Sequence, residues 1–269
     1  MNKNKSLVLF DRNLDKDNAI ITKTDITIKV HGTDKVLFRG RNKVILPGSY
    51  FTACKHFDIA PQVKLPSYND ALGLDAVQAL TDKEERSALV YLFAVGTDGC
   101  GPESSQVYDV DYTKWIQPKS LVPFRYVYDD NDLNPTLRQK YFGRKKIVGT
   151  DKIAYYFKAF ESTPTIHQQY IDGTPIDENI FISDNITDVE TYVELNLTVT
   201  KEDCREFFDA TTGINDAKIN TISLLTAVPK ELNGYTYYQG IRPLTKLNFP
   251  NESLIDLTKG IDITYHIYY

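Results

Sequence analysis

The last residues of the chain, IDITYHIYY over Ile261–Tyr269, alternate apolar and polar side chains. Successive side chains of a strand point to opposite faces, so this alternation is typical of a strand with one buried face. It predicts that the chain finishes on a strand and that truncation after Lys259 damages folding. The expected inward set is Ile263, Tyr265, Ile267 and Tyr269, and the set left for solvent or a neighbour is Thr264, His266 and Tyr268.

Strand patterns recur through the rest of the sequence. Ile20–Phe38 alternates on both sides of a His31–Asp34 turn and predicts a hairpin, whereas Ala88–Val95 is continuously apolar and predicts a fully buried strand. Asn233-Gly234 is the residue pair that a type I′ hairpin turn requires. Further strands are expected at Gln106–Tyr112, Ile153–Phe160, Thr191–Thr200, Ile219–Val228, Tyr235–Tyr238 and, as an edge or crossing strand because of its two prolines, Pro118–Tyr128.

Helix signals are few and short. Pro47–Phe57 has apolar residues at helical spacing, and a second helix is expected through Leu137 and Tyr141, ended by Gly143. Thr200 as N-cap and Gly213 as the stop predict a helix of about three turns. Residues 58–87 carry prolines and a charged run, which indicates a long surface excursion that is either a flexible loop or an interface loop.

These patterns define the expected fold class. The sequence holds 18 Tyr and 13 Phe, a bias that favours strands, and helices and strands alternate too irregularly for a doubly wound parallel sheet. We expect a β-dominated α+β fold of mostly antiparallel sheets or a sandwich, with a few short helices and long loops. Residues 1–269 are expected to form one structural unit, with two interleaved β-rich lobes, about 1–128 and 129–269, as the alternative.

Net charge, apolar stretches and cysteine content restrict the partners and the cellular compartment that we expect for this chain. The net charge is −5 and the basic residues are scattered, so nucleic acid is not an expected partner. No window approaches the roughly 18 apolar residues of a membrane span, so membrane insertion is not expected either. The N-terminal apolar stretch Leu7–Phe10 is too short for a secretory signal, which predicts synthesis in the cytoplasm. Cys54, Cys100 and Cys204 lie far apart and are odd in number, as expected of buried free thiols.

The Gly-rich turn GTDGCGPESS offers the first candidate for catalysis, Cys100, which would need a histidine nearby in space. The turn lacks the lysine and the glycine spacing of phosphate-binding loops, so a plain β-turn with an incidental thiol is the stronger interpretation.

Acidic and metal-ligating candidates are equally weak. Cys54 and His56 face different directions on a helix, and the run Asp129–Asp132 lacks the glycine and terminal glutamate of a calcium loop. Asp172, Asp177 and Glu178 lie among turn residues. We therefore assign no catalytic, metal or cofactor-binding residue, and expect no cofactor and no enzyme.

Four phrases point to a family: GRNKVILPGSYFTACKHF, VYLFAVGTDGCGPESSQVYDVDYTKWIQPKSLVPFRY, YFGRKKI and DCREFFDATTGINDAKINTISLLTA. They resemble virion structural proteins of large tailed bacteriophages, over roughly Arg39 to Tyr269. The end of the chain is similar in outline to the closing region of baseplate wedge proteins. Its order is INTISLLTA, a hairpin, RPLTKLNFPNESLID and a terminal strand. The resemblance implies a virion protein without an active site.

The resemblance implies assembly with other virion structural proteins and with copies of the same chain. A terminal strand with unpaired backbone groups would suit that role, and Thr264, His266 and Tyr268 mark its candidate assembly edge. The alternative is that the strand lies inside its own sheet. The other functions considered are a neck or tail-terminator protein, a capsid-associated protein, and a carbohydrate-binding or sugar-cleaving virion module. A cytosolic enzyme using Cys100 is a further alternative.

Overall fold

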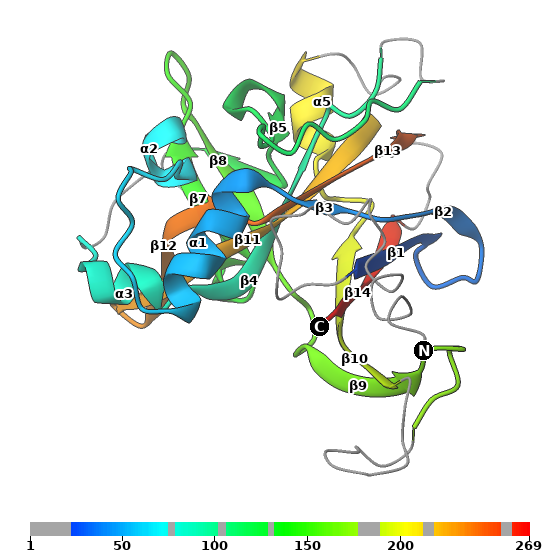
Figure 1. Cartoon of the computed structure of the whole chain (residues 1–269). Helices are drawn as coiled ribbons and strands as arrows, with labels where there is room; N and C mark the ends of the chain where they lie inside the picture. The colour runs from blue at the N-terminus through cyan, green and yellow to red at the C-terminus, as the bar shows by residue number, and fades with distance from the viewer. Residues whose placement is uncertain are drawn as a thin grey trace, which may run out of the picture.

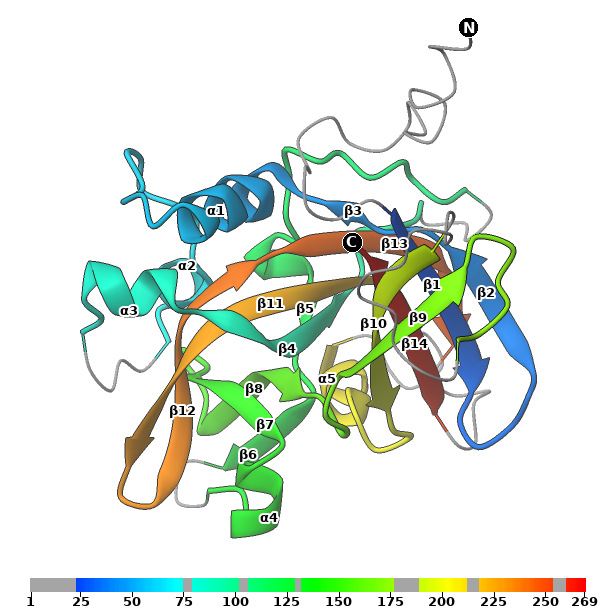
Figure 2. The same ribbon diagram turned by 60° about the horizontal axis from the view of Figure 1, so that its bottom comes forward.

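The computed structural model describes residues 23–74, 79–101, 106–128, 132–176, 189–211, 218–253 and 260–269. Strands dominate this part of the chain, and they pair antiparallel in two sheets, one of five strands and one of nine (Figures 1 and 2). The expected β-dominated α+β class, with antiparallel sheets and short helices, is confirmed. None of the helices in these ranges is long and apolar enough to cross a membrane.

The five-stranded sheet is built around the end of the chain. Its strand order is β2 (Val36–Gly40), β1 (Lys23–Val30), β14 (Ile261–Tyr268), β10 (Val189–Val199) and β9 (Thr165–Tyr170). β14 is the central strand, and all eight of its residues pair with β1 on one side and with β10 on the other. The predicted β1–β2 hairpin is present within the described residues.

This central position answers the question raised by the terminal strand. Both backbone edges of β14 are bonded within its own sheet, so Thr264, His266 and Tyr268 do not form a free assembly edge. Their alternating side chains still face away from buried Ile263, Tyr265 and Ile267. Two assignments at the end are wrong: Tyr269 lies beyond the strand and is 51% exposed, whereas Tyr268 is buried against Tyr192.

The nine-stranded sheet runs β3 (Lys43–Val44), β13 (Thr245–Ser253), β11 (Lys218–Leu232), β4 (Leu89–Gly96), β8 (Lys152–Ala159) and β6 (Arg125–Tyr128). β12 (Tyr235–Pro243) also pairs with β11, β5 (Leu121–Val122) with β4, and β7 (Tyr141–Lys146) with β8. Asn233 and Gly234 both have positive φ, which confirms the predicted two-residue turn between β11 and β12. β4 is buried from Leu92 onward, but Leu89 is 49% exposed, so the prediction of a fully buried strand is wrong at its start. β6 is an edge strand as expected.

The main core lies between the two sheets. Tyr265 of β14 and Leu197 of β10 belong to the same buried cluster as Phe93 of β4 and Leu224 of β11. Because each sheet draws strands from both halves of the sequence, the halves share this core. The three cysteines are free and buried, as predicted.

The segment 58–87 is more ordered than expected of a surface loop. It contains α2 (Tyr68–Leu72) and α3 (Asp82–Arg86), which lie near α1 (Leu46–His56) beside β11 and β12, on the side away from the five-stranded sheet (Figure 2). Tyr68 is fully buried in a second core cluster and donates a hydrogen bond to the carbonyl of Ile116 at 3.0 Å. The helix predicted at Pro47–Phe57 is α1.

Three predicted elements differ from the structure: two helices have other bounds, and one strand is absent from the described residues. The helix α4 spans only Pro135–Arg138, because Tyr141 begins β7 and Gly143 lies inside that strand with positive φ. Gln106–Tyr112 forms no strand, only an isolated bridge between Val107 and Cys100. The helix expected after Thr200 is the shorter α5 (Arg205–Thr211), since Cys204 has a left-handed φ of 64° that delays its start, and Gly213 lies outside the described residues.

Candidate functional site

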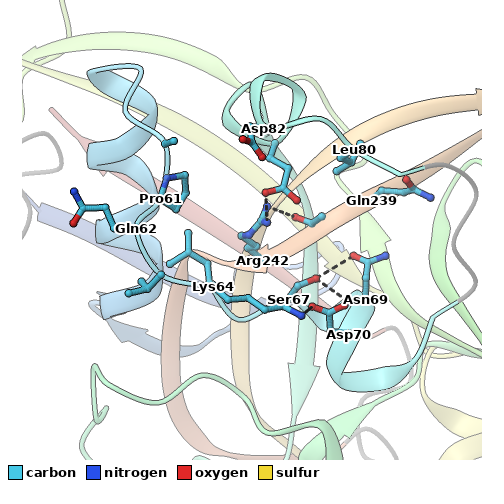
Figure 3. A pocket seen from close by; sticks show the side chains of 15 residues that line it. Pro61, Gln62, Lys64, Ser67, Asn69, Asp70, Leu80, Asp82, Gln239 and Arg242 are labelled. Carbon is cyan, nitrogen blue, oxygen red and sulfur yellow. Dashed lines mark hydrogen bonds and ion pairs between the residues drawn. The ribbon is translucent and has the colours of Figure 1, made fainter.

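An open groove of about 480 Å³ lies between the 58–87 segment and β12 (Figure 3). We call it the β12 groove. Residues 60–65 form one wall, the first turn of α2 and the helix α3 form two others, and Gln239, Gly240 and Arg242 of β12 form the floor. The groove therefore joins the 58–87 segment to a strand that lies more than 150 residues further along the chain.

Local capping interactions hold the walls. The Ser67 hydroxyl accepts the backbone N–H of Asn69 at the start of α2, and the Asn69 side-chain oxygen accepts the backbone N–H of Ile241 at 2.7 Å. At α3, Thr81 and Glu84 form a reciprocal capping box. The Asn69 bond fixes α2 to the outer edge of β12, so the spacing between wall and floor is set by a direct contact.

Arg242 lies at the centre of the groove (Figure 3). Its guanidinium is 2.9 Å from the Glu85 carboxylate, donates to the Gly240 carbonyl at 3.3 Å and stacks over the Phe51 ring at 5.6 Å. The Nε atom is buried and finds no hydrogen-bond partner among the described residues. Arg242 thus acts as a fixed positive charge whose bonding capacity is only partly used.

The charges around Arg242 are mixed. Lys64 and Asp70 form an exposed pair at 3.0 Å, while Asp82 is exposed and, in the described ranges, has no ion-pair partner. The lining thus holds three carboxylates, those of Asp70, Asp82 and Glu85, against two basic groups. A small excess of negative charge faces the open space.

The chain entering the groove wall exposes large apolar side chains. Phe57 is 71% exposed, Ile59 54% and Val63 60%, all within seven consecutive positions. We call these three residues the apolar rim. Isolated exposed apolar residues are ordinary, but a cluster beside a groove marks an interaction surface. Apolar contact plus charges of both signs is the composition of a protein-binding patch.

The predicted site residues lie elsewhere, on the outward face of the five-stranded sheet. His266 Nε2 is 3.1 Å from a carboxylate oxygen of Glu194, and its ring lies 4.7 Å from that of Tyr192. Thr264 donates a hydrogen bond to Asn196, while Tyr268 packs against Tyr192 and accepts a hydrogen bond from Gln169. The structure therefore brings the three residues together as one polar and aromatic face.

A hollow of about 460 Å³ continues this face past Thr264. In it the Asp262 carboxylate lies 2.7 Å from His31 Nδ1 and accepts hydrogen bonds from Gly32 N and from the Thr198 hydroxyl. Burial alone would raise the pKa of Asp262, but these hydrogen bonds outweigh it and lower the pKa. The carboxylate is charged and joins the β1–β2 turn to β10 and β14.

Cys100 is not placed as a nucleophile. Its thiol is buried and donates to the Phe249 carbonyl at 2.9 Å, and burial raises its pKa. A nucleophilic cysteine needs a lowered pKa and access to substrate, so this geometry opposes the Cys100 hypothesis. Among the described residues of its Gly-rich turn, Gly99 N donates to the Asn220 side chain.

The remaining candidates are dispersed. Asp172 caps its own turn by accepting the backbone N–H of Thr174, and Asp177 and Glu178 lie outside the described residues, as do residues 129–131. Asp132 accepts a hydrogen bond from Tyr155 and pairs with Arg138 at 3.3 Å. Cys54 is buried in α1, whereas His56 lies at its exposed end. The described residues contain no cluster of three metal-ligating side chains.

The comparisons with protein-family models, curated proteins and solved structures found no match to this chain. The sequence had indicated 58–87 as an interface segment, and the groove lies there, but its floor was missed. Gln239 and Arg242 are three positions apart, which places two side chains on opposite faces of a regular strand, so the sequence does not indicate that both line one groove. The run FDIAPQV, with apolar residues in a polar loop, is the signal that could have revealed the apolar rim.

Proposed function

We propose that this chain is a non-enzymatic structural subunit of a tailed-phage virion that works through protein–protein contacts in several copies, with the tail baseplate as its favoured location. The observation that carries the protein-contact role is the apolar rim beside the β12 groove. Fully solvated apolar side chains cost free energy that is recovered when a partner covers them, at about 25 cal/mol per Å² of buried apolar surface.

The virion context is supported by the sequence resemblance over Arg39–Tyr269. The fold is compatible with it, because a central C-terminal strand and a core shared by both halves make a rigid unit that can present fixed surfaces to neighbours. The burial of Cys100 supports a role without thiol catalysis.

Mass spectrometry of purified particles tests the proposal first. We expect peptides of this chain in intact virions, at a copy number that fits the symmetry of a tail or baseplate. A chain that is absent from particles and monomeric when purified would contradict the proposal. A cryo-EM map of the particle would separate the baseplate from a neck, tail-terminator or capsid position.

A saccharide-binding virion module is the second candidate, and one observation favours it. The outward face of the five-stranded sheet combines the Tyr192 and His266 rings with the hydroxyl, amide and carboxylate groups that line the hollow at Asp262. Such groups suit the apolar and hydroxyl-bearing faces of a sugar ring. Binding on a glycan array that is lost with Tyr192→Ala would favour this function, and a blank array would remove it.

A further inference from the structure

We propose that the β12 groove of one copy of this chain receives the N-terminal segment, residues 3–12, of a second copy. The inference rests on the proposed function, because it requires several copies to meet. It names the partner of the β12 groove, whose composition alone indicates only a protein-binding surface. Charge, apolar content and reach each support this choice.

Charge complementarity is the first argument. Residues 3–12 contain three basic side chains, Lys3, Lys5 and Arg12, against the single acidic Asp11. The groove offers a surplus carboxylate, and Asp82 is exposed without an ion-pair partner among the described residues. A basic segment would supply that missing partner, and at an exposed site this contributes more to orientation than to affinity.

Apolar complementarity is the second argument. Between its basic residues the segment carries Leu7–Phe10, the sequence LVLF. The groove wall carries Val63, and the remainder of the apolar rim, Phe57 and Ile59, precedes that wall directly in the chain. Contact between these two sets would remove apolar surface of both partners from water, which is the main source of affinity for such a segment.

Reach is the third argument. About a dozen residues separate Phe10 from Lys23, where β1 begins, and an extended chain of that length spans about 40 Å. A compact chain of this size has a radius of gyration of about 18 Å, so the segment can extend to a neighbouring copy. A segment-to-groove contact uses different surfaces on the two partners, and it therefore builds a ring or an open row of subunits.

The test uses the full-length chain and sedimentation velocity over a wide concentration range. We expect self-association that is weakened about tenfold or more by Val63→Asp in the groove, and equally by Leu9→Asp in the segment. Val148→Asp is the matched control, because Val148 is 92% exposed in the turn between β7 and β8. Circular dichroism should show all three variants folded.

Mixing the two defective variants makes the test decisive. Val63→Asp keeps an intact segment and Leu9→Asp keeps an intact groove, so an equimolar mixture should form heterodimers at a concentration where each variant alone is monomeric. Wild-type chain that stays monomeric, a Leu9→Asp variant that associates normally, or a mixture without heterodimers would each overturn the inference. The presence of the chain in particles is measured separately, so the proposed function can stand or fall independently.

Discussion

The ammonium of Lys158 lies 3.0 Å from the carboxylate of Asp203, and both side chains are buried. Lys158 belongs to β8 of the larger sheet, whereas Asp203 follows β10 of the smaller one. Lys158 also donates to the Thr198 carbonyl at 2.6 Å, and the Tyr141 hydroxyl donates to Asp203 at 2.7 Å. One hydrogen-bonded charge pair therefore ties the two sheets together.

Removing either partner should strongly destabilise the fold. Asp203→Ala removes the buried carboxylate between Lys158 and Arg125 and leaves Lys158 only the partly exposed Glu161 carboxylate at 3.1 Å. We expect a loss of about 3–5 kcal/mol in the free energy of unfolding. Lys158→Met should cost less, because Asp203 keeps Tyr141, Arg125 and the Thr200 N–H. Urea unfolding measures both. A loss below about 1 kcal/mol for Asp203→Ala would show that the pair does not hold the sheets.

Two tyrosines should respond to the same substitution with opposite signs. Tyr265 is fully buried, and its hydroxyl has no hydrogen-bond partner among the described residues, so Tyr265→Phe removes an unpaired polar group. We expect a gain of about 1 kcal/mol in unfolding free energy. Tyr141→Phe deletes the bond to Asp203 and should cost about 1.5–3 kcal/mol, since the acceptor is charged. Equal effects in thermal unfolding would contradict this assignment.

The terminal strand should be indispensable. Truncation after Lys259 deletes β14, which pairs with β1 and β10 along its whole length, so the five-stranded sheet would lose its centre. We expect insoluble or unfolded protein. Deletion of Tyr269 alone is the control, because that residue is largely exposed and lies beyond the strand. A soluble truncated chain with native circular dichroism would show that the sheet forms without β14.

The success of the sequence analysis follows from periodicity. Where one face is buried, as in Ile261–Tyr268, or a run of consecutive residues is, as in β4 from Leu92 onward, the apolar pattern reports the environment directly. The Asn233-Gly234 turn was also predictable, because positive φ restricts which residues can occupy it. Whether a strand is central or at an edge is decided by distant segments, which is why the position of β14 could not be inferred.

The failures have local physical causes. At Thr200 only half of the capping pattern is present. Asp203 accepts the Thr200 backbone N–H, but the Thr200 hydroxyl finds no hydrogen-bond partner among the described residues, and the Asp203 carboxylate is also bound to Lys158. The helix therefore does not start at Thr200, because Asp203 is held by tertiary contacts and Cys204 adopts a left-handed φ instead of a helical one. The β12 groove could not be assembled from sequence either, because its walls meet only through long-range contacts such as that of Asn69 with Ile241.

Gly240 should be required for the shape of the β12 groove. Its φ is +57°, and an added Cβ would lie 2.9 Å from Leu80 Cδ1 and 3.1 Å from a guanidinium nitrogen of Arg242. Gly32 also has positive φ, but a Cβ there meets no atom within 4 Å. Gly32→Ala should therefore cost only the backbone strain, about 1–2 kcal/mol, and Gly240→Ala should cost more. Similar losses in urea unfolding would mean that the floor adjusts without cost.

Glu84 should contribute to stability at acid pH with a definite sign. Hydrogen bonds from Lys230 and from Thr81 lower its pKa from 4.5 to about 2 in the folded chain. A carboxyl whose folded pKa is depressed stabilises the fold above its unfolded pKa, and this contribution disappears as pH falls from about 4.5 to about 2. Glu84→Gln should therefore flatten the stability curve in that window and leave its shape above pH 6 unchanged.

Glu85→Gln is the matched control, because Glu85 pairs with Arg242 outside the capping box. Urea unfolding at successive pH values measures the difference, and parallel curves for wild type and Glu84→Gln would show that the bonds from Lys230 and Thr81 to Glu84 are not formed in solution.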